Sequence, residues 1–258
     1  MTAARQYLAL SRRSIVNIAR QPAAVVPAFL FPLMFLALTS ASLNRSIQLP
    51  GFPAVDSFLQ FAVATTIIQG ALFGSIAAGS DMATDIEHGF FERLVASPVS
   101  RTSILVGRVA GAAVLGFVQA LVFFGVTSLF GLNVESGVPG ILLVALVAAV
   151  VSAGIGALAV AFGLRTGSAE AVQGSFPLLF VLMFFSSAFF PRTLMEGWFK
   201  TVATYNPISW LIEAARSLVI DGLDVGQFLV ALGVAAVIFV VGNLLAGLAL
   251  RRRLAVGA

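Results

Sequence analysis

Six long stretches of the chain contain no charged residue, and this pattern constrains the fold more than any other feature. The stretches are 21–44, 57–80, 109–134, 136–164, 171–191 and 225–250. The shortest has 21 residues, and a helix needs about 20 apolar residues to cross the hydrocarbon core of a bilayer. Strands of a membrane barrel would instead alternate apolar and polar residues, which none of these stretches does. We therefore predict an all-α integral membrane protein with six transmembrane helices.

The composition agrees with this class and excludes several kinds of site. Hydrophobic residues make up 59% of the chain and charged residues 10%, whereas soluble domains have about 45–50% and about 25%. The chain has no cysteine, which excludes disulfides and thiolate metal sites. Its basic charge lies on arginines that flank the apolar stretches, so membrane topology explains it and no nucleic-acid partner is expected.

The expected layout assigns residues 1–258 to one transmembrane domain. It begins with an interfacial helix over 5–20, whose arginines lie on one side and whose apolar residues lie on the other. The predicted spans are 22–43, 57–79, 103–130, 138–164, 171–190 and 226–250. A cytoplasmic helix over 81–97 separates spans two and three, and a re-entrant helical element over 192–224 separates spans five and six.

The re-entrant element is predicted from its mixed polarity. Asn206 and Pro207 break it into two short helices, and Trp198, Tyr205 and Trp210 are aromatic residues of the kind enriched at the membrane interface. Glu213 and Arg216 are three residues apart and are expected to pair on one helix face.

Residues 81–101 form the longest polar segment between two apolar halves. At 100° per residue, one helical stripe contains Met82, Ile86, Phe90 and Leu94, and acidic residues lie opposite. Ser97 and Pro98 would end this helix. The pattern leaves two interpretations open: the helix is held by another protein, or it rests on lipid headgroups.

The distribution of cations predicts the orientation. With the N-terminus inside, the inner side carries 11 cations and the outer side only 4, namely Arg45, Arg192, Lys200 and Arg216. Cytoplasmic loops carry the excess of lysine and arginine. Both termini and residues 81–101 are therefore expected in the cytoplasm.

The chain lacks the groups that an enzyme or a self-powered carrier needs. No ionisable residue lies in the six stretches, although ion-coupled carriers place such groups inside the bundle. The only lysine, Lys200, follows a phenylalanine rather than the glycine of a phosphate-binding loop. His88 is the only histidine, so neither a metal site nor a catalytic pair is expected. We predict no enzymatic activity and no cofactor in this chain.

The segment DIEHGFFERLVASPVSR resembles the corresponding segment of type-2 ATP-binding-cassette exporter permeases of the daunorubicin/doxorubicin-resistance kind. In that family an acid, a glycine, Glu-Arg-Leu and Ser-Pro recur before the third span. Asn206-Pro207 followed by Trp210 and Arg216 is similar to the family's segment before its last span. Phe90 departs from the family, which usually has a small hydroxyl residue there. The resemblance implies that this segment couples the chain to a separate ATPase subunit. The residues that it assigns to this contact are Asp85, Ile86, Glu87, Gly89, Phe90, Glu92, Arg93, Leu94, Ser97 and Pro98.

The resemblance implies a permease subunit in a bacterial plasma membrane. Its cytoplasmic helix would dock on a separate ATPase subunit, present in two copies, with ATP and Mg²⁺ bound by that partner. A second permease chain, giving a homodimer, and membrane lipid would complete the assembly. The apolar stripe would enter a groove of the ATPase while Asp85 and Glu92 pair with cations at its rim.

The uncharged interior favours an amphipathic or hydrophobic substrate, such as a drug or a lipid. The residues that could line its path are Gln69, Gln173, Phe176, Phe180 and Phe184. Two alternatives remain: an ion-coupled carrier that works alone, and a lipid-modifying enzyme. The second would use the acids of the outer segment, Glu196, Glu213, Asp221 and Asp224.

Overall fold

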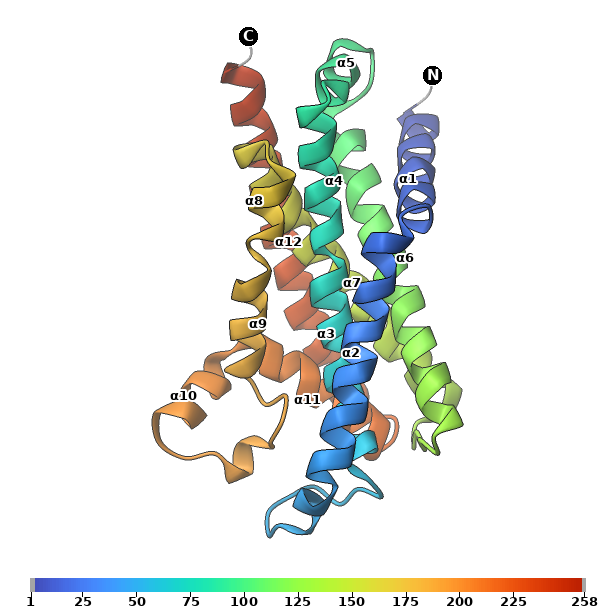
Figure 1. Cartoon of the computed structure of the whole chain (residues 1–258), viewed down its shortest axis with the longest axis vertical. Helices are drawn as coiled ribbons and strands as arrows, with labels where there is room; N and C mark the ends of the chain where they lie inside the picture. The colour runs from blue at the N-terminus through green and yellow to red at the C-terminus, as the bar shows by residue number, and fades with distance from the viewer. Residues whose placement is uncertain (1–2, 257–258) are drawn as a thin grey trace.

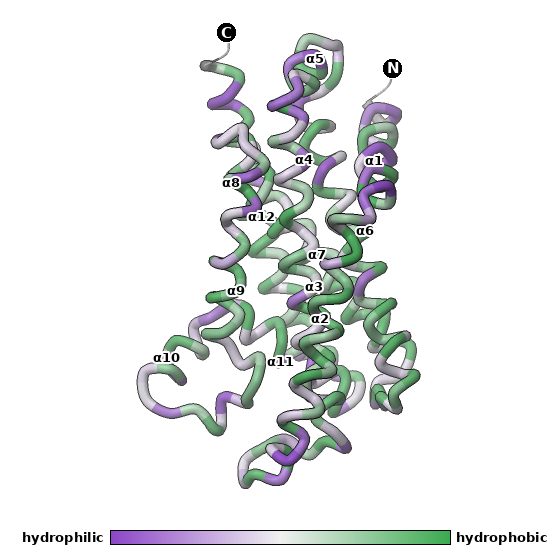
Figure 2. Tube along the Cα trace, viewed as in Figure 1, coloured by the Kyte–Doolittle hydropathy of each residue, from purple (hydrophilic) through white to green (hydrophobic). Residues whose placement is uncertain are grey.

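The computed structural model describes residues 3–256, which are helical or irregular and contain no strand. The long helices run roughly along one axis and form an elongated bundle (Figure 1). Both ends of the described chain lie at one end of this bundle, and the helix α10 lies toward the other. The middle of the bundle is mainly hydrophobic, and hydrophilic residues gather toward both ends (Figure 2). The chain is therefore an all-helical protein with the polarity pattern of a membrane protein.

The first half of the chain contains α1 (Ala3–Ala19), α2 (Pro22–Leu43), the 3₁₀ helix η1 (Asn44–Gln48), α3 (Phe58–Gly74), α4 (Ile76–Glu87), α5 (Phe90–Ala96) and α6 (Arg101–Leu129). The second half contains α7 (Gly137–Thr166), α8 (Ala169–Gln173), α9 (Phe176–Phe184), η2 (Arg192–Leu194), α10 (Gly197–Tyr205), α11 (Pro207–Ile220) and α12 (Val225–Val256).

Helix α3 lies at the centre of the bundle. All of its residues except Leu59 are buried, and it packs against α2, α6, α7 and α11. The main hydrophobic core forms around it, with Phe123 and Phe124 of α6 and Leu211 and Ile212 of α11 fully buried. Helices α2 and α12 instead bury only 11% and 17% of the residues in their most apolar windows, as expected of helices that face lipid.

Helices α3 and α4 follow one another through a single residue, Ser75. Its hydroxyl donates to the carbonyl of Ala71, four residues back, a contact that often bends a helix. The helical path continues to Glu87, well beyond the predicted end of span two at residue 79. The polar segment is therefore partly an extension of the central helix.

Among residues 3–256, five helices are long and apolar enough to cross a membrane: Val25–Gln48, Phe58–Glu87, Arg101–Leu129, Gly137–Thr166 and Val225–Ala255. The predicted span over 171–190 is not one continuous helix. It consists of α8 and α9, separated at Gly174 and Ser175, and α9 ends at Phe184. Pro177 lies in the first turn of α9 and cannot donate a hydrogen bond to α8. The six-span layout remains a prediction.

Glycines allow three pairs of helices to approach closely. A side chain at Gly79 would collide with the backbone of Ala159, which places α4 directly against α7. A side chain at Gly242 would meet the carbonyl of Gly154, between α12 and α7. Gly107 and Gly111 of α6 face α1. This is the close packing that small residues permit between membrane helices.

Candidate functional site

The candidate site is the polar tip, residues 81–98, at the end of the bundle that holds both ends of the described chain (Figures 1 and 2). The tip reverses direction at Gly89, whose φ of 66° is left-handed. The amide of His88 donates to the carbonyl of Thr84 at 3.0 Å as α4 ends, and α5 begins at Phe90. A side chain in a left-handed conformation costs about 1–2 kcal/mol, which glycine avoids. The prediction of one helix over 81–97 is therefore wrong.

The end of α5 is held by Ser97 and by α1. The Ser97 hydroxyl donates to the carbonyl of Leu94 at 2.7 Å. Gln6 of α1 donates from its side-chain amide to the carbonyl of Pro98 at 3.0 Å, and its side-chain oxygen accepts from the amide of Ser100 at 3.0 Å. The segment between α5 and α6 is therefore joined to α1 by two hydrogen bonds of Gln6.

The apolar residues of the tip pack into the protein itself. Met82 is 1% exposed and Phe91 is 3% exposed, within a core cluster that contains Ile104 of α6. Ile86 and Leu94 are half-buried against the same cluster. The interpretation that Met82, Ile86, Phe90 and Leu94 enter a groove of a partner is therefore not supported. The turn at Gly89 changes the helical phase, so Phe91 rather than Phe90 faces the core.

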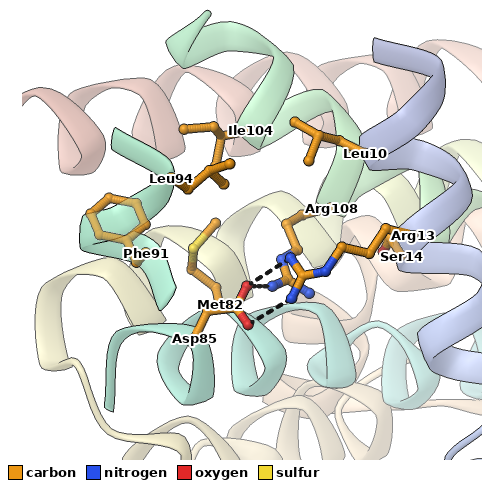
Figure 3. A pocket seen from close by; sticks show the side chains of 10 residues that line it. Leu10, Arg13, Ser14, Met82, Asp85, Phe91, Leu94, Ile104 and Arg108 are labelled. Atoms are coloured by element: carbon orange, nitrogen blue, oxygen red, sulfur yellow. Dashed lines mark hydrogen bonds and ion pairs between the residues drawn. The ribbon is translucent and has the colours of Figure 1, made fainter. Parts of the chain in front are cut away.

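Beneath the tip lies a cluster of opposite charges (Figure 3). Arg108 of α6 contacts Asp85 with Nη2 and approaches Asp81 with Nη1 at 3.4 Å. Arg13 of α1 donates to the two carboxylate oxygens of Asp85 at 3.1 and 3.3 Å. Partial burial lowers the pKa of Arg13, and the negative charge of Asp81 opposes this shift. Two cations and two carboxylates from three helices neutralise one another here.

Hydrogen bonds extend this charge cluster to the end of α1 and to the residue before α2. The side-chain amide of Asn17 donates to Asp81 at 2.8 Å, and that of Gln21 donates at 3.4 Å. The guanidinium of Arg13 also lies over the ring of Phe90, 3.9 Å from its centre. Helix α1 is therefore joined to the tip.

Sequence reasoning missed this charge cluster, because it assigned Arg13 and Arg108 only to the topology. A signal was present: Arg13, Asn17 and Gln21 are spaced by four residues, as are Asp81 and Asp85. Residues four apart lie on the same face of a helix. Two complementary polar faces of this kind can match each other, although the sequence does not say that they meet.

Only a few charged groups of the tip face outward. Glu87 accepts from the amide of Ala169 at 2.9 Å and so caps α8. Glu92 keeps 55% of its side chain exposed, with Arg253 of α12 at 3.8 Å. His88 and Arg93 are also exposed. The surface available to a partner is therefore polar, and Asp85 contributes little to it because its carboxylate is paired within the chain.

The residues predicted to line a path lie in different surroundings. Phe176 and Phe180 of α9 pack on Phe73 of α3, with ring centres 4.5 and 5.7 Å apart. Phe184 continues this aromatic column and is exposed. Gln69 is buried in α3, and Gln173 is exposed at the end of α8. The structure groups the phenylalanines but does not bring the two glutamines into a common environment.

The residues of the predicted re-entrant element lie at the opposite end of the bundle. The Asn206 side chain accepts from the amide of Ile208 at 2.9 Å and donates to the carbonyl of Leu182 at 2.6 Å, while Pro207 starts α11. The indole of Trp210 donates to the carbonyl of Thr204 at 2.9 Å. Asn206 thus caps α11 and holds it to α9.

The predicted pair of Glu213 and Arg216 does not form. Glu213 pairs with Arg192 of η2, whose Nε donates to Glu213 Oε1 at 2.7 Å. Arg216 points into the bundle and donates to the carbonyl of Phe61 at 3.0 Å. The prediction counted only neighbours on one helix, and the fold supplies closer partners from other segments.

In the described part of the chain, no group of three or more histidine, cysteine or acidic residues could hold a metal ion. The fold and the tip define a multi-pass helical membrane protein with a polar element fastened at one end. The chain belongs to the ABC-2 type transporter family, whose sequence profile matches residues 5–220.

Curated relatives are named as permeases. The chain is 28% identical over 210 residues to the "Daunorubicin resistance ABC transporter permease protein DrrB1" of Streptomyces coeruleorubidus, covering 80% of this chain and 72% of that protein. It is 28% identical over 211 residues to the "Putative transport permease ycf38" of Porphyra purpurea, covering 81% and 72%. It is 25% identical over 217 residues to the "Probable doxorubicin resistance ABC transporter permease protein DrrC" of Mycobacterium tuberculosis (strain CDC 1551 / Oshkosh), covering 84% and 78%. Membership of this family implies a separate ATPase subunit as partner.

Proposed function

We propose that this chain is the transmembrane permease subunit of an ATP-driven exporter and that its polar tip docks on the ATPase subunit. The observation that carries this proposal is the tip itself. Its apolar side is anchored in the protein core, and His88, Glu92 and Arg93 are left exposed at one end of the bundle. A surface of this kind suits a charged rim contact with another protein.

The structure supplies a route from the tip to the centre of the bundle. The tip begins on α4, which continues α3, and α3 is the most buried helix. The charge cluster of Arg13, Asp81, Asp85 and Arg108 joins the same segment to α1 and α6. A displacement of the tip by ATP-driven closure would therefore move α3, α1 and α6 together.

The proposed complex contains two permease chains, as a homodimer, and two ATPase subunits that bind ATP and Mg²⁺. The excess of arginine at the end that holds the tip supports a cytoplasmic location of this end, in a bacterial cell. The aromatic column of Phe73, Phe176 and Phe180 favours an amphipathic or hydrophobic substrate, such as a drug or a lipid. Efflux of a drug by this complex would contribute to antibiotic resistance.

The docking role is tested with the ATPase subunit that copurifies with the chain from its native membrane. Replacing the exposed pair with alanine, Glu92→Ala with Arg93→Ala, should weaken copurification and ATP hydrolysis by the complex about tenfold, because rim charges steer and orient a partner. Folding should change little, since exposed ion pairs contribute only about 0–1 kcal/mol. The matched control is Glu196→Ala, an exposed acid before α10. Equal hydrolysis and equal copurification in all variants would refute docking at the tip.

A transport assay distinguishes an ATP-driven exporter from an ion-coupled carrier that works alone. Vesicles that contain the chain and its ATPase should export a fluorescent amphipathic dye only when ATP is supplied. Vesicles that contain the chain alone, under a proton gradient, should not move the dye. Uptake driven by the gradient without the ATPase would overturn the proposed function.

A further inference from the structure

An open pocket of about 310 Å³ lies at the end of the bundle opposite the tip. It is formed by α11, η2 and the loop between η1 and α3. The residues that line it include Pro53, Arg192, Glu213, Arg216, Ser217 and Asp221. Its volume is near the lower limit of small-molecule sites, about 300 Å³. The pocket is separate from the tip and has no part in docking the ATPase.

Arg216 forms the inner wall of this pocket and is 5% exposed. Its Nε donates to the carbonyl of Phe61 at 3.0 Å, and its Nη2 donates to the Thr65 hydroxyl at 3.2 Å and to the carbonyl of Ser187 at 3.1 Å. Its guanidinium carbon lies 3.6 Å from the centre of the Phe61 ring. Every one of these partners is uncharged.

The charge of Arg216 is therefore not neutralised by a carboxylate at ion-pair distance among residues 3–256. Its Nη1 has no hydrogen bond to any described residue, although the other two nitrogens are occupied. Burying a cation costs several kcal/mol unless an opposite charge compensates for it. A buried guanidinium with one free nitrogen beside a pocket favours an anion as the ligand of that pocket.

Glu213 and Asp221 line the pocket, but neither lies within ion-pair distance of Arg216. Glu213 pairs with Arg192 through both carboxylate oxygens, and Arg192 lies 4.9 Å from the centre of the Trp210 ring. Asp221 is exposed at the end of α11, where water screens it. The buried wall of the pocket therefore carries the guanidinium of Arg216, whereas Asp221 lies at its exposed rim.

The surroundings indicate which anion the pocket meets. Trp198, Tyr205 and Trp210, on the neighbouring helices α10 and α11, are all exposed. Exposed tryptophan and tyrosine are enriched at the headgroup level of a bilayer. The anion that is abundant at this level is the phosphate of a lipid headgroup, and arginine binds phosphate in a directed, charge-assisted geometry.

We propose that this pocket binds a phosphate group, supplied by a phospholipid headgroup, through Nη1 of Arg216. The phosphate lies between α11, η2 and the loop before α3, so a bound lipid joins three segments that carry few hydrogen bonds to one another. Thr193 already links η2 to this loop, by donating to the carbonyl of Gly51 at 2.9 Å. Binding of the lipid requires only residues of this chain and does not depend on the exporter function.

The test measures lipid retention by the purified full chain in detergent, using native mass spectrometry. The probes are phosphatidylglycerol and diacylglycerol with identical acyl chains, which differ in the headgroup and its phosphate. Phosphatidylglycerol should be retained at least about tenfold better, the effect expected of one charge-assisted hydrogen bond in a buried site. Inorganic phosphate is added as a competitor. Displacement of the lipid by millimolar phosphate would show that the pocket also takes free phosphate, and it would support the phosphate chemistry.

Variants of the pocket complete the test. Arg216→Gln should abolish the preference for phosphatidylglycerol. Because Arg216 also holds α3 and α11 together, Ser217→Trp serves as a second variant that fills the pocket and keeps the arginine. Arg45→Gln is the matched control, an exposed cation of η1 outside the residues that line the pocket. Equal retention of the two lipids by the unmodified chain, or an unchanged preference in Ser217→Trp, would overturn the proposal.

Discussion

Arg108 is the central residue of the charge cluster beneath the tip, and its replacement gives the sharpest test of this structure. Its side chain is 7% exposed and contacts Asp85, which is 16% exposed, and Asp81, which is 12% exposed. Arg108→Met keeps most of the aliphatic stem and removes the charge. The two carboxylates would then lie partly buried with fewer cations beside them.

The expected loss of stability depends on the contacts that the two carboxylates keep in the variant. Removing one partner of a buried ion pair costs about 3–5 kcal/mol, because it leaves a buried charge without compensation. Here Asp85 keeps Arg13 at 3.1 Å and Asp81 keeps Asn17 at 2.8 Å. These contacts reduce the estimate to about 2–3 kcal/mol. For a chain of this size that corresponds to a decrease of about 5–10 °C in the melting temperature.

The assay is thermal unfolding of the purified chain in one detergent, followed by tryptophan fluorescence. Both tryptophans, Trp198 and Trp210, lie away from the charge cluster, so their signal reports global unfolding and not a local change. Arg101→Met is the control, an exposed arginine of the same helix. It should shift the melting temperature by about 1–2 °C at most, since exposed substitutions cost within about 0.5 kcal/mol.

A double variant isolates the interaction itself. Asp85→Asn removes the charge of one of the two carboxylates that lose Arg108 in the single variant, so the double variant should be clearly more stable than the sum of the two single effects. Two outcomes contradict this reasoning. One is a shift for Arg108→Met no larger than that for Arg101→Met, and the other is strict additivity of the two single variants.

Three further predictions concern backbone and packing. Gly79→Val should abolish accumulation of the folded chain in the membrane, because a side chain there collides with the backbone of Ala159; normal expression would contradict this contact. Gly89→Ala should destabilise the turn in the tip by about 1–2 kcal/mol. It should speed limited proteolysis between α4 and α5 without lowering the global melting temperature, and unchanged proteolysis would argue against the left-handed turn. Phe73→Ala should lower the melting temperature by about 6–20 °C, since a buried phenylalanine contributes about 3–5 kcal/mol. Its ring contacts Phe176 and Phe180, and a shift below that of Arg101→Met would contradict this packing.

Uncharged stretches show where a chain can enter a bilayer, and they located most of the apolar helices. They do not show whether a helix continues past the first charge. Helix α4 extends to Glu87 because Arg13 and Arg108 neutralise the acids at 81 and 85. The stretch 171–191 has no charge, yet it is broken at Gly174 and Ser175. The hydropathy of the stretch does not reveal this break in the helix.

The tip could be located from the sequence, but its arrangement could not. The motif around Gly89 marks the segment, whereas the helical stripe assumed a constant rotation that ends at this glycine. Arg108 and Arg216 were counted as cations of the topology. Their roles depend on residues that are 23 or more positions away, such as Asp85 and Phe61. Long-range pairings of this kind are set by the packing of the helices and not by a local pattern.

Both ends of the described chain lie beside the tip (Figure 1), and Arg253 of α12 donates to the carbonyl of Leu164 at 3.1 Å. A bulky affinity tag or fluorescent protein fused at either terminus would therefore lie beside the face that is proposed to dock the ATPase. Tagged versions of the protein for biochemistry should carry small epitopes on long flexible linkers. For the same reason, a dye attached near the C-terminus would be well placed to report, by energy transfer, when the ATPase arrives and leaves.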